Sequence, residues 1–226
     1  MATKIVILGD GLLGSEIHNQ TGWDMISRKS GTLNINDFVG LYKKIFNYDV
    51  IINCIANTDS YSSNKEDHWD TNYRFASELS DMCSLKKRKL VQISTEFVYA
   101  NNKGLPTEED LPLPDNTWYA YTKLLADEYI KMCNKNYLIC RLLHKPNPFP
   151  YPNVFKTQTS GDTVDKIAQL VIELIKKDAN GVYNVGTGNK FLKEIAPNSE
   201  EIEGPHYIPR DTRMNLNKLN KFLNNE

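Results

Sequence analysis

A tyrosine and a lysine four residues apart are the first candidates for chemistry in this chain. They lie in the segment Tyr119-Ala120-Tyr121-Thr122-Lys123, which begins a predicted helix. Residues at this spacing share one helix face, so the phenol and the ammonium can meet in the same space. A nearby ammonium lowers the pKa of a phenol from about 10 and allows proton exchange with a substrate oxygen. The pair therefore predicts a general acid, although a half-buried ring beside a solvated lysine has the same spacing.

A threonine that precedes Tyr119 by 24 residues is the next candidate. Thr95 directly follows a predicted strand over residues 90–94. In open α/β sheets ligands bind outside the carboxyl ends of the strands, which is where its hydroxyl would lie. We therefore expect Thr95 to orient the oxygen that Tyr119 protonates.

A glycine turn near the N-terminus has the pattern of a phosphate-binding site. An apolar run over residues 4–8 leads directly into Gly9-Asp10-Gly11-Leu12-Leu13-Gly14 and then into a helical pattern. In such a turn the first glycine permits the tight bend, the second admits a pyrophosphate, and the third allows close packing of helix and strand. The pattern predicts a dinucleotide site, and a plain structural turn is the alternative.

Short apolar strands alternate with helical patterns along the whole chain. This alternation predicts a Rossmann-type α/β fold, in which a parallel sheet is wound on both faces by helices. The predicted strands cover residues 4–8, 24–27, 50–54, 90–94, 137–142 and 182–185, and the predicted helices include 37–46, 75–83, 119–134 and 167–175.

Composition indicates a single α/β domain with a small appendage. The chain has 226 residues and a mass of 25.9 kDa. A net charge of −1 and a pI of about 6.4 give no broad attraction to nucleic acid or membrane, so we expect neither as a partner. The four cysteines form no C-x-x-C pair, which is typical of a reducing compartment. Because the first strand follows Met1 closely and no apolar run is long enough to span a bilayer, we expect a cytoplasmic protein.

Taken together, these motifs resemble one known family. Their order and the interval from Thr95 to Tyr119 are similar to those of the extended short-chain dehydrogenase/reductases, and most similar to the dTDP-4-dehydrorhamnose reductases. The resemblance covers nearly the whole chain. The matching segments are the glycine turn, residues 48–53 with Ala56 and Thr58, Asn72, and residues 90–99, 119–124, 158–161, 181–186 and 209–219.

The chain departs from this family on the substrate side. Its glycine turn is one residue shorter than the usual G-x-x-G-x-x-G, and residues 142–156 are compressed and proline-rich where the family has a longer insertion. The resemblance implies one NAD(P)-binding domain over residues 1–226, with 143–160 and 186–226 forming a shortened C-terminal substrate-binding lobe. We expect the loop 144–155 to close over the substrate.

The residues after the second predicted strand bear on the choice of cofactor. An acidic residue that would bind a free ribose 2′-hydroxyl is missing there, and Ser27, Arg28 and Lys29 follow instead. Because Arg28 can pair with a 2′-phosphate, the sequence favours NADPH over NADH. A merely solvated loop at Arg28 and Lys29 is the alternative.

The remaining cofactor contacts are implied by the resemblance. Asn34 and Ile35 would lie beside the adenine, and the residues after the third strand would line the path toward the nicotinamide. The full predicted set is Gly9, Gly11, Leu12, Leu13, Gly14, Ser27, Arg28, Asn34, Ile35, Ile55, Ala56, Asn57, Thr58, Asn72, Tyr119 and Lys123. The four histidines have no metal-ligand spacing, so we read them as structural or surface residues and predict no metal site.

The activity implied by the resemblance is reduction of a 4-keto-6-deoxy nucleotide sugar, as in dTDP-rhamnose biosynthesis. Tyr119 would protonate the keto oxygen, Lys123 would lower the pKa of the phenol and bind ribose, and Thr95 would hold the oxygen. Thr95 and Glu96 are the predicted substrate contacts. Glu96 would bind sugar hydroxyls or assist proton transfer, and capping of backbone amides is its alternative role.

Two other functions stay open at the level of sequence. One is a nucleotide-sugar epimerase or dehydratase that works with a retained NAD. The other is a non-catalytic, NADP-binding regulatory subunit, which the compressed substrate region would suit. Many extended relatives form homodimers through the helix that carries the Tyr-x-x-x-Lys motif, and here Leu124, Leu125, Tyr129 and Met132 would serve such an interface or the core.

Overall fold

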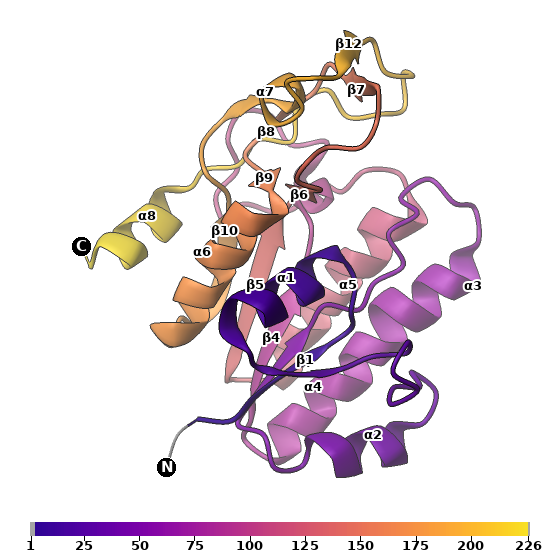
Figure 1. Ribbon diagram of the computed structural model, residues 1–226, viewed down its shortest axis with the longest axis vertical. Coiled ribbons are helices and arrows are strands. Elements are labelled where there is room, and N and C mark those ends of the chain that lie inside the picture. Colours follow the sequence, from indigo (N-terminus) through magenta and orange to yellow (C-terminus); the bar gives the residue numbers. More distant parts are fainter. Residues whose placement is uncertain (1–2, 226) are drawn as a thin grey trace.

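A six-stranded parallel sheet forms the centre of the computed structural model, which describes residues 3–225 (Figure 1). Every pair of neighbouring strands is parallel, which confirms the predicted fold class. Across the sheet the strands are β10 (Gly181–Val185), β5 (Tyr137–Leu142), β4 (Lys89–Ile93), β3 (Val50–Asn53), β1 (Ile5–Leu8) and β2 (Asp24–Ile26).

Helices cover both faces of this sheet. Because successive side chains of a strand point to opposite faces, Ile7 packs toward α1 (Leu12–Thr21) and α6 (Val164–Lys176), while Val6 and Leu8 pack toward the other face. That second face is covered by α2 (Phe38–Ile45), α4 (Phe75–Leu85) and α5 (Trp118–Cys133). Burial on both faces explains why the strands read as continuous apolar runs.

The helix before β4 starts earlier than its apolar pattern predicts. It begins as α3 (Lys65–His68), continues through a π-helical turn, η1 (Trp69–Arg74), and then becomes α4. Single π-helical turns inside α-helices are frequent at functional sites. Asn72 lies buried in this turn, at the end that faces the loop after β3.

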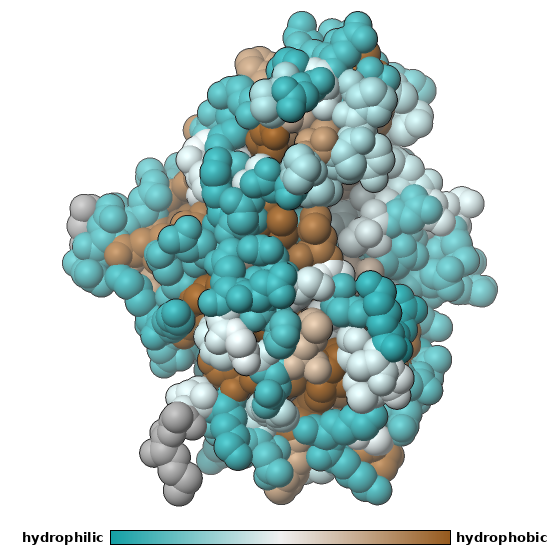
Figure 2. Space-filling model, in the orientation of Figure 1, coloured by the Kyte–Doolittle hydropathy of each residue, from teal (hydrophilic) through white to brown (hydrophobic). Residues whose placement is uncertain are grey.

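A small lobe lies above the carboxyl end of the sheet (Figure 1). Its β7 (Asn153–Phe155) pairs with β12 (Glu200–Ile202), and Val154 packs with Leu192 and Ile195 of α7 (Leu192–Ile195) in a core of its own. Figure 2 shows a few hydrophobic residues at the surface of this lobe, between hydrophilic ones. That the lobe binds substrate stays a prediction.

Short strand pairs and a final helix complete the fold. The pairs are β6 (His144–Lys145) with β9 (Asp162–Thr163), and β8 (Gln158–Thr159) with β11 (Lys190–Phe191). The last helix, α8 (Asn217–Asn224), packs against β10 through the rings of Phe222 and Tyr183. Within residues 3–225 no helix has the length and apolar character needed to cross a bilayer.

Candidate active site

The structure brings Thr95 and Tyr119 together at the carboxyl edge of the sheet. Tyr119 lies in the first turn of α5, whose start is fixed by Thr117: its hydroxyl oxygen accepts a hydrogen bond from the Ala120 N–H at 3.2 Å. Thr95 follows β4 and begins a short 3₁₀ helix, η2 (Glu96–Tyr99). Burial raises the pKa of the Tyr119 phenol, and the neighbouring Thr95 hydroxyl opposes this effect by lowering it. Two residues that lie 24 positions apart in the sequence thus meet at one edge of the sheet.

The net effect of the surroundings on the pKa of Tyr119 is opposite to the expected lowering. Burial is the dominant influence and raises the pKa of the phenol, and the negative charges of Glu96 and Asp127 raise it further. The predicted lowering by Lys123 is therefore not what the structure shows, because desolvation of the phenolate outweighs the favourable contributions. Tyr119 is held as a neutral phenol, which is the form that donates a proton.

Lys123 lies on the same helix face as Tyr119, as its spacing predicts. Its side chain is buried, and Nζ donates a hydrogen bond to the Ile93 carbonyl at 2.5 Å, at the end of β4. Burial lowers the pKa of Lys123 to about 8, against the opposing effects of Asp127 and Cys54. The ammonium therefore lies close to Thr95 and titrates nearer to neutrality than an exposed lysine.

A buried ion pair supports this helix face and was missed in the sequence analysis. Asp127 and Arg141 are both fully buried, and Arg141 Nε lies 3.1 Å from Asp127 Oδ2. The hydroxyl of Ser94 donates to the same oxygen at 2.9 Å. The available signal was the position of Asp127, four residues after Lys123 on one helix face.

The glycine turn has the geometry that phosphate binding requires. Gly9 has φ +100°, a conformation that other residues rarely adopt. A Cβ on Gly14 would lie 2.1 Å from the Gly9 carbonyl oxygen, so helix α1 could not pack there with a larger residue. Around Gly11, by contrast, a Cβ would meet no atom within 4 Å. The backbone at the N-terminus of α1 is thus open to an approaching anion, as predicted.

The other predicted cofactor contacts lie along the same edge of the sheet. Ser27 is buried at the end of β2, whereas Arg28 is exposed beside it. Lys29 Nζ lies 3.7 Å from a carboxylate oxygen of Asp10 in the glycine turn. Residues 55–58 follow β3, and 34–35 form part of the loop before α2. The predicted contacts therefore share one edge, although their binding to a cofactor stays a prediction.

Glu96 is not available to a substrate as the sequence analysis expected. Its side chain is completely buried. Its Oε2 accepts a hydrogen bond from Thr159 Oγ1 at 2.7 Å, and its Oε1 accepts one from the hydroxyl of Thr212. Both carboxylate oxygens therefore accept hydrogen bonds from threonines in the C-terminal part of the chain, and neither oxygen caps backbone amides. The sequence analysis missed these threonines because they are far from Glu96 in the sequence.

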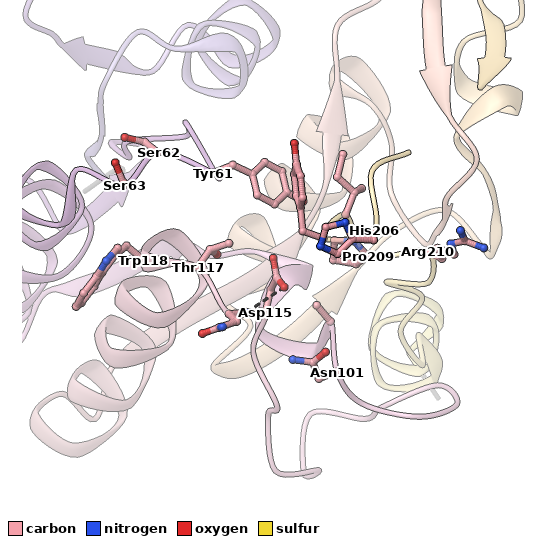
Figure 3. A pocket seen from close by; sticks show the side chains of 14 residues that line it. Tyr61, Ser62, Ser63, Asn101, Asp115, Thr117, Trp118, His206, Pro209 and Arg210 are labelled. Atoms are coloured by element: carbon pink, nitrogen blue, oxygen red, sulfur yellow. Dashed lines mark hydrogen bonds between the residues drawn. The ribbon is translucent and has the colours of Figure 1, made fainter. Parts of the chain in front are cut away.

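A cavity of about 760 Å³ lies beside Thr117 and Trp118, the two residues that precede Tyr119 at the start of α5. An almost continuous series of aromatic rings leads into it, with centroid distances of 5.9 Å from Tyr119 to Phe97, 6.4 Å from Phe97 to Tyr61 and 5.2 Å from Tyr61 to Tyr207. Figure 3 shows Tyr61 pointing toward His206 and Pro209, which also line the cavity.

The walls of this cavity come from four segments that are far apart in the sequence. They are formed by residues 61–63, 100–101, 115–118 and 206–210. The loop 144–155, which we expected to close over the substrate, is not among them. Its two ends pair with β9 and β12, and its closure over a substrate stays a prediction.

Two histidines take structural roles close to the site. His68 is fully buried, with Nδ1 3.2 Å from Asn72 Nδ2 and its ring centroid 6.3 Å from that of Tyr119. Burial lowers the pKa of His144 to about 4. Among the described residues, no group of three or more His, Cys, Asp or Glu side chains is arranged to hold a metal ion.

Comparison of the sequence with known families gives one match. The family model described as "RmlD substrate binding domain" matches residues 3–144. The chain is 30% identical over 150 residues to the spore coat polysaccharide biosynthesis protein SpsK of Bacillus subtilis, covering 62% of this chain and 52% of that protein. It is 29% identical over 140 residues to a dTDP-4-dehydrorhamnose reductase of Mycobacterium tuberculosis, covering 56% of this chain and 45% of that protein. The chain thus spans about half the length of these curated relatives.

Solved structures share the fold over nearly the whole chain. A dTDP-4-dehydrorhamnose reductase from Bacillus anthracis in complex with NADP has a TM-score of 0.81 at 19% identity, covering 97% of this chain and 92% of that one. A mutant UDP-glucuronic acid 4-epimerase from Bacillus cereus, in complex with a UDP-sugar and NAD, has a TM-score of 0.80 at 16% identity, covering 98% and 93%. At these identities the likeness establishes the fold alone.

Proposed function

This chain belongs to the RmlD substrate binding domain family, and from this premise we propose that it is an NADPH-dependent reductase of a 4-keto-6-deoxy nucleotide sugar. The observation that supports the proposal best is the grouping of Thr95, Tyr119 and Lys123 at the carboxyl edge of the sheet, beside the glycine turn.

In the proposed mechanism, NADPH supplies a hydride to the keto carbon when it is bound. The neutral phenol of Tyr119 donates its proton to the keto oxygen, while the hydroxyl of Thr95 hydrogen-bonds to the same oxygen and fixes its position. The ammonium of Lys123, on the same helix face and held by the Ile93 carbonyl, would bind the ribose of the cofactor, as the family resemblance implies. Lys123 is buried and Tyr119 is half-buried, which limits the access of water and strengthens these interactions.

The dinucleotide would lie along the edge formed by the ends of β1, β2 and β3. The N–H groups around Gly11 would hold the pyrophosphate, because the backbone there is open and lies at a helix N-terminus. The exposed guanidinium of Arg28 would pair with the 2′-phosphate of NADPH. NADH, which lacks this phosphate, is the alternative cofactor.

The nucleotide sugar would occupy the cavity beside Tyr119. Its volume of about 760 Å³ is within the range typical of small-molecule sites. The aromatic rings of Tyr61 and Tyr207 provide faces for stacking against a base or a sugar ring. The sugar would lie at the end nearest Tyr119, since the reaction occurs there.

We also propose that two copies of the chain associate through the face of η1 and α5. Large side chains are exposed there, with Trp69 at 42%, Trp118 at 40%, Tyr121 at 46% and Met132 at 76% of their surfaces. Exposed aromatic residues and methionine are enriched in protein interfaces. Light scattering of Met132→Glu, with Leu111→Glu in an exposed loop as the control, would test this: we expect only the first variant to lower the mass toward that of a monomer.

The reductase proposal is tested by incubating the purified protein with NADPH and a 4-keto-6-deoxy nucleotide sugar. We expect oxidation of NADPH, which is measured as a fall in its near-ultraviolet absorbance. A regulatory subunit would bind NADPH without oxidising it. An epimerase or dehydratase would retain NAD through purification and convert a nucleotide sugar without added cofactor.

A further inference from the structure

A buried carboxylate joins the catalytic edge of the sheet to the last part of the chain. Glu96 directly follows Thr95 and has no exposed surface. It accepts hydrogen bonds from Thr159, in β8, and from Thr212. Thr212 belongs to a segment over residues 206–215, which we call the C-terminal strap.

The C-terminal strap lies along β8 and then returns to the body of the protein. The Gln158 N–H donates to the Arg210 carbonyl at 2.9 Å, and the Thr212 N–H donates to the Gln158 carbonyl at 2.9 Å. Beyond this, the Asn215 N–H donates to the Pro106 carbonyl at 2.9 Å. The strap is therefore bonded to β8 through its backbone, and Glu96 is the side chain that bonds both of them to the catalytic edge.

The first part of the C-terminal strap is a wall of the cavity. His206, Tyr207, Pro209 and Arg210 all line it, opposite Tyr61 (Figure 3). Loss of the bonds to Glu96 would leave the strap attached to β8 and anchored at its end by Met214 and Asn215, but its middle part at Thr212 would no longer be bonded to the residue that follows Thr95. The shape of the cavity would then vary, since one wall would move against the catalytic residues.

We propose that Glu96 is a positioning residue, which holds the C-terminal strap, and with it one wall of the substrate cavity, in a fixed place relative to Thr95 and Tyr119. The inference rests on the proposed function, in that it takes this cavity as the nucleotide-sugar site. Glu96 does not touch the substrate. It acts on the cavity wall through Thr212 and on Thr95 through the backbone that they share.

The charge of Glu96 also has an effect on the pKa of Tyr119, which can be measured. Burial is the main influence and raises the pKa of Glu96 to about 7. The two threonines and Lys145 lower this pKa, and Asp211 raises it. The negative charge of Glu96 in turn raises the pKa of Tyr119. Removal of that charge should therefore lower the pKa of the phenol.

The first arm of the test measures the C-terminal strap without any substrate. Trypsin is added to the full chain in the presence of NADPH, and cleavage after Arg210 and Arg213 is followed by mass spectrometry. Removal of a hydrogen bond to a buried charged group should increase the rate in Glu96→Ala and in Thr212→Val by about tenfold or more, if cleavage follows the population of the open segment. Glu96→Gln retains an acceptor oxygen and should be cleaved at a rate closer to wild type.

Glu109→Gln is the matched control, because Glu109 is exposed in the loop that precedes α5. It should be cleaved at the wild-type rate. Cleavage of both Glu96→Ala and Thr212→Val at that same rate would overturn the proposal. If Glu96→Ala does not fold, Thr212→Val and Glu96→Gln still decide the question, since each retains most of the buried volume.

The second arm measures NADPH oxidation with the 4-keto nucleotide sugar. In Thr212→Val, the KM for the nucleotide sugar should rise by about tenfold, while the Kd for NADPH should change by less than about twofold. In Glu96→Gln, the alkaline limb of the pH profile should move to lower pH. A weakening of both ligands alike, with an unchanged profile, would indicate general damage and would overturn the positioning role. If the wild type itself oxidises no NADPH, the reductase proposal fails, and the proteolysis result still decides whether Glu96 holds the strap.

Discussion

Asn72 holds both backbone polar groups of Asn57. Its Oδ1 accepts a hydrogen bond from the Asn57 N–H at 2.8 Å, and its Nδ2 donates to the Asn57 carbonyl at 3.1 Å. Asn72 is buried in the π-helical turn η1, and Nδ2 also lies 3.2 Å from His68 Nδ1. A single side chain thereby fixes the loop after β3, which is predicted to line the cofactor's path.

Replacement of Asn72 by alanine should loosen this loop. Two backbone groups of Asn57 would lose their partner, so we expect a destabilisation of about 1–3 kcal/mol and weaker NADPH binding. Chemical denaturation and fluorescence titration would measure the two effects. Asn47→Ala, at an exposed position before β3, should change neither. NADPH binding at wild-type strength in Asn72→Ala would show that the loop does not depend on this contact.

Tyr119→Phe should remove the proton donor and keep the packing of the ring. We expect turnover to fall by about a hundredfold or more, as for the loss of a general acid, with NADPH binding nearly unchanged. Steady-state kinetics and cofactor titration would measure these quantities. Tyr121→Phe, two residues along the same helix with an exposed side chain, is the control and should retain activity. Wild-type turnover by Tyr119→Phe would refute the assignment.

Arg28→Ala should weaken NADPH selectively. The loss of a charge-assisted pair with the 2′-phosphate should cost about 1.5–3 kcal/mol of binding free energy, while NADH binding should hardly change. Lys29→Ala serves as the control, because Lys29 lies beside Asp10 and not at the predicted phosphate position. Calorimetric titration of each variant with both cofactors would separate the effects. Equal losses for NADPH and NADH would mean that Arg28 does not select the cofactor.

Glu96→Gln should change how stability depends on pH. The pKa of Glu96 is raised to about 7 in the folded protein, from 4.5. Between these two values the folded state binds more protons than the unfolded state, so this group makes the free energy of unfolding fall as pH rises from 4.5 to 7. Relative to wild type, the glutamine variant should become more stable across this window, by on the order of 3 kcal/mol at most.

His144 changes the free energy of unfolding with pH in the opposite direction to Glu96, so its contribution must be separated from that of Glu96. Its pKa is lowered to about 4 from 6.5, so its contribution to stability increases with pH between these values. Denaturation curves for wild type and Glu96→Gln, measured from pH 4 to 8, isolate the effect of Glu96 in their difference. A difference that stays constant with pH would show that Glu96 does not titrate in this range.

Local patterns in the sequence were sufficient for the sheet and for the positions of Tyr119, Lys123 and the glycine turn. The alternation of short strands with helical patterns predicted all six strands, and the central strands read as apolar runs because they are buried on both faces. The Tyr-x-x-x-Lys spacing placed Tyr119 and Lys123 on one helix face, and the glycine turn predicted a backbone that is open at Gly11. Each of these features depends on residues within one or two neighbouring elements, which is why the sequence alone determines them.

Tertiary structure decided what depends on residues that are far apart in the chain. The pKa of Tyr119 is set by burial, and the sequence offers only the spacing to Lys123. Glu96 looked like a substrate contact because its partners, Thr159 and Thr212, lie 63 and 116 residues away. The cavity wall likewise comes from residues 206–210 and not from the nearer loop 144–155. Desolvation and long-range hydrogen bonding arise only when the chain is folded, so no local pattern of residues records them.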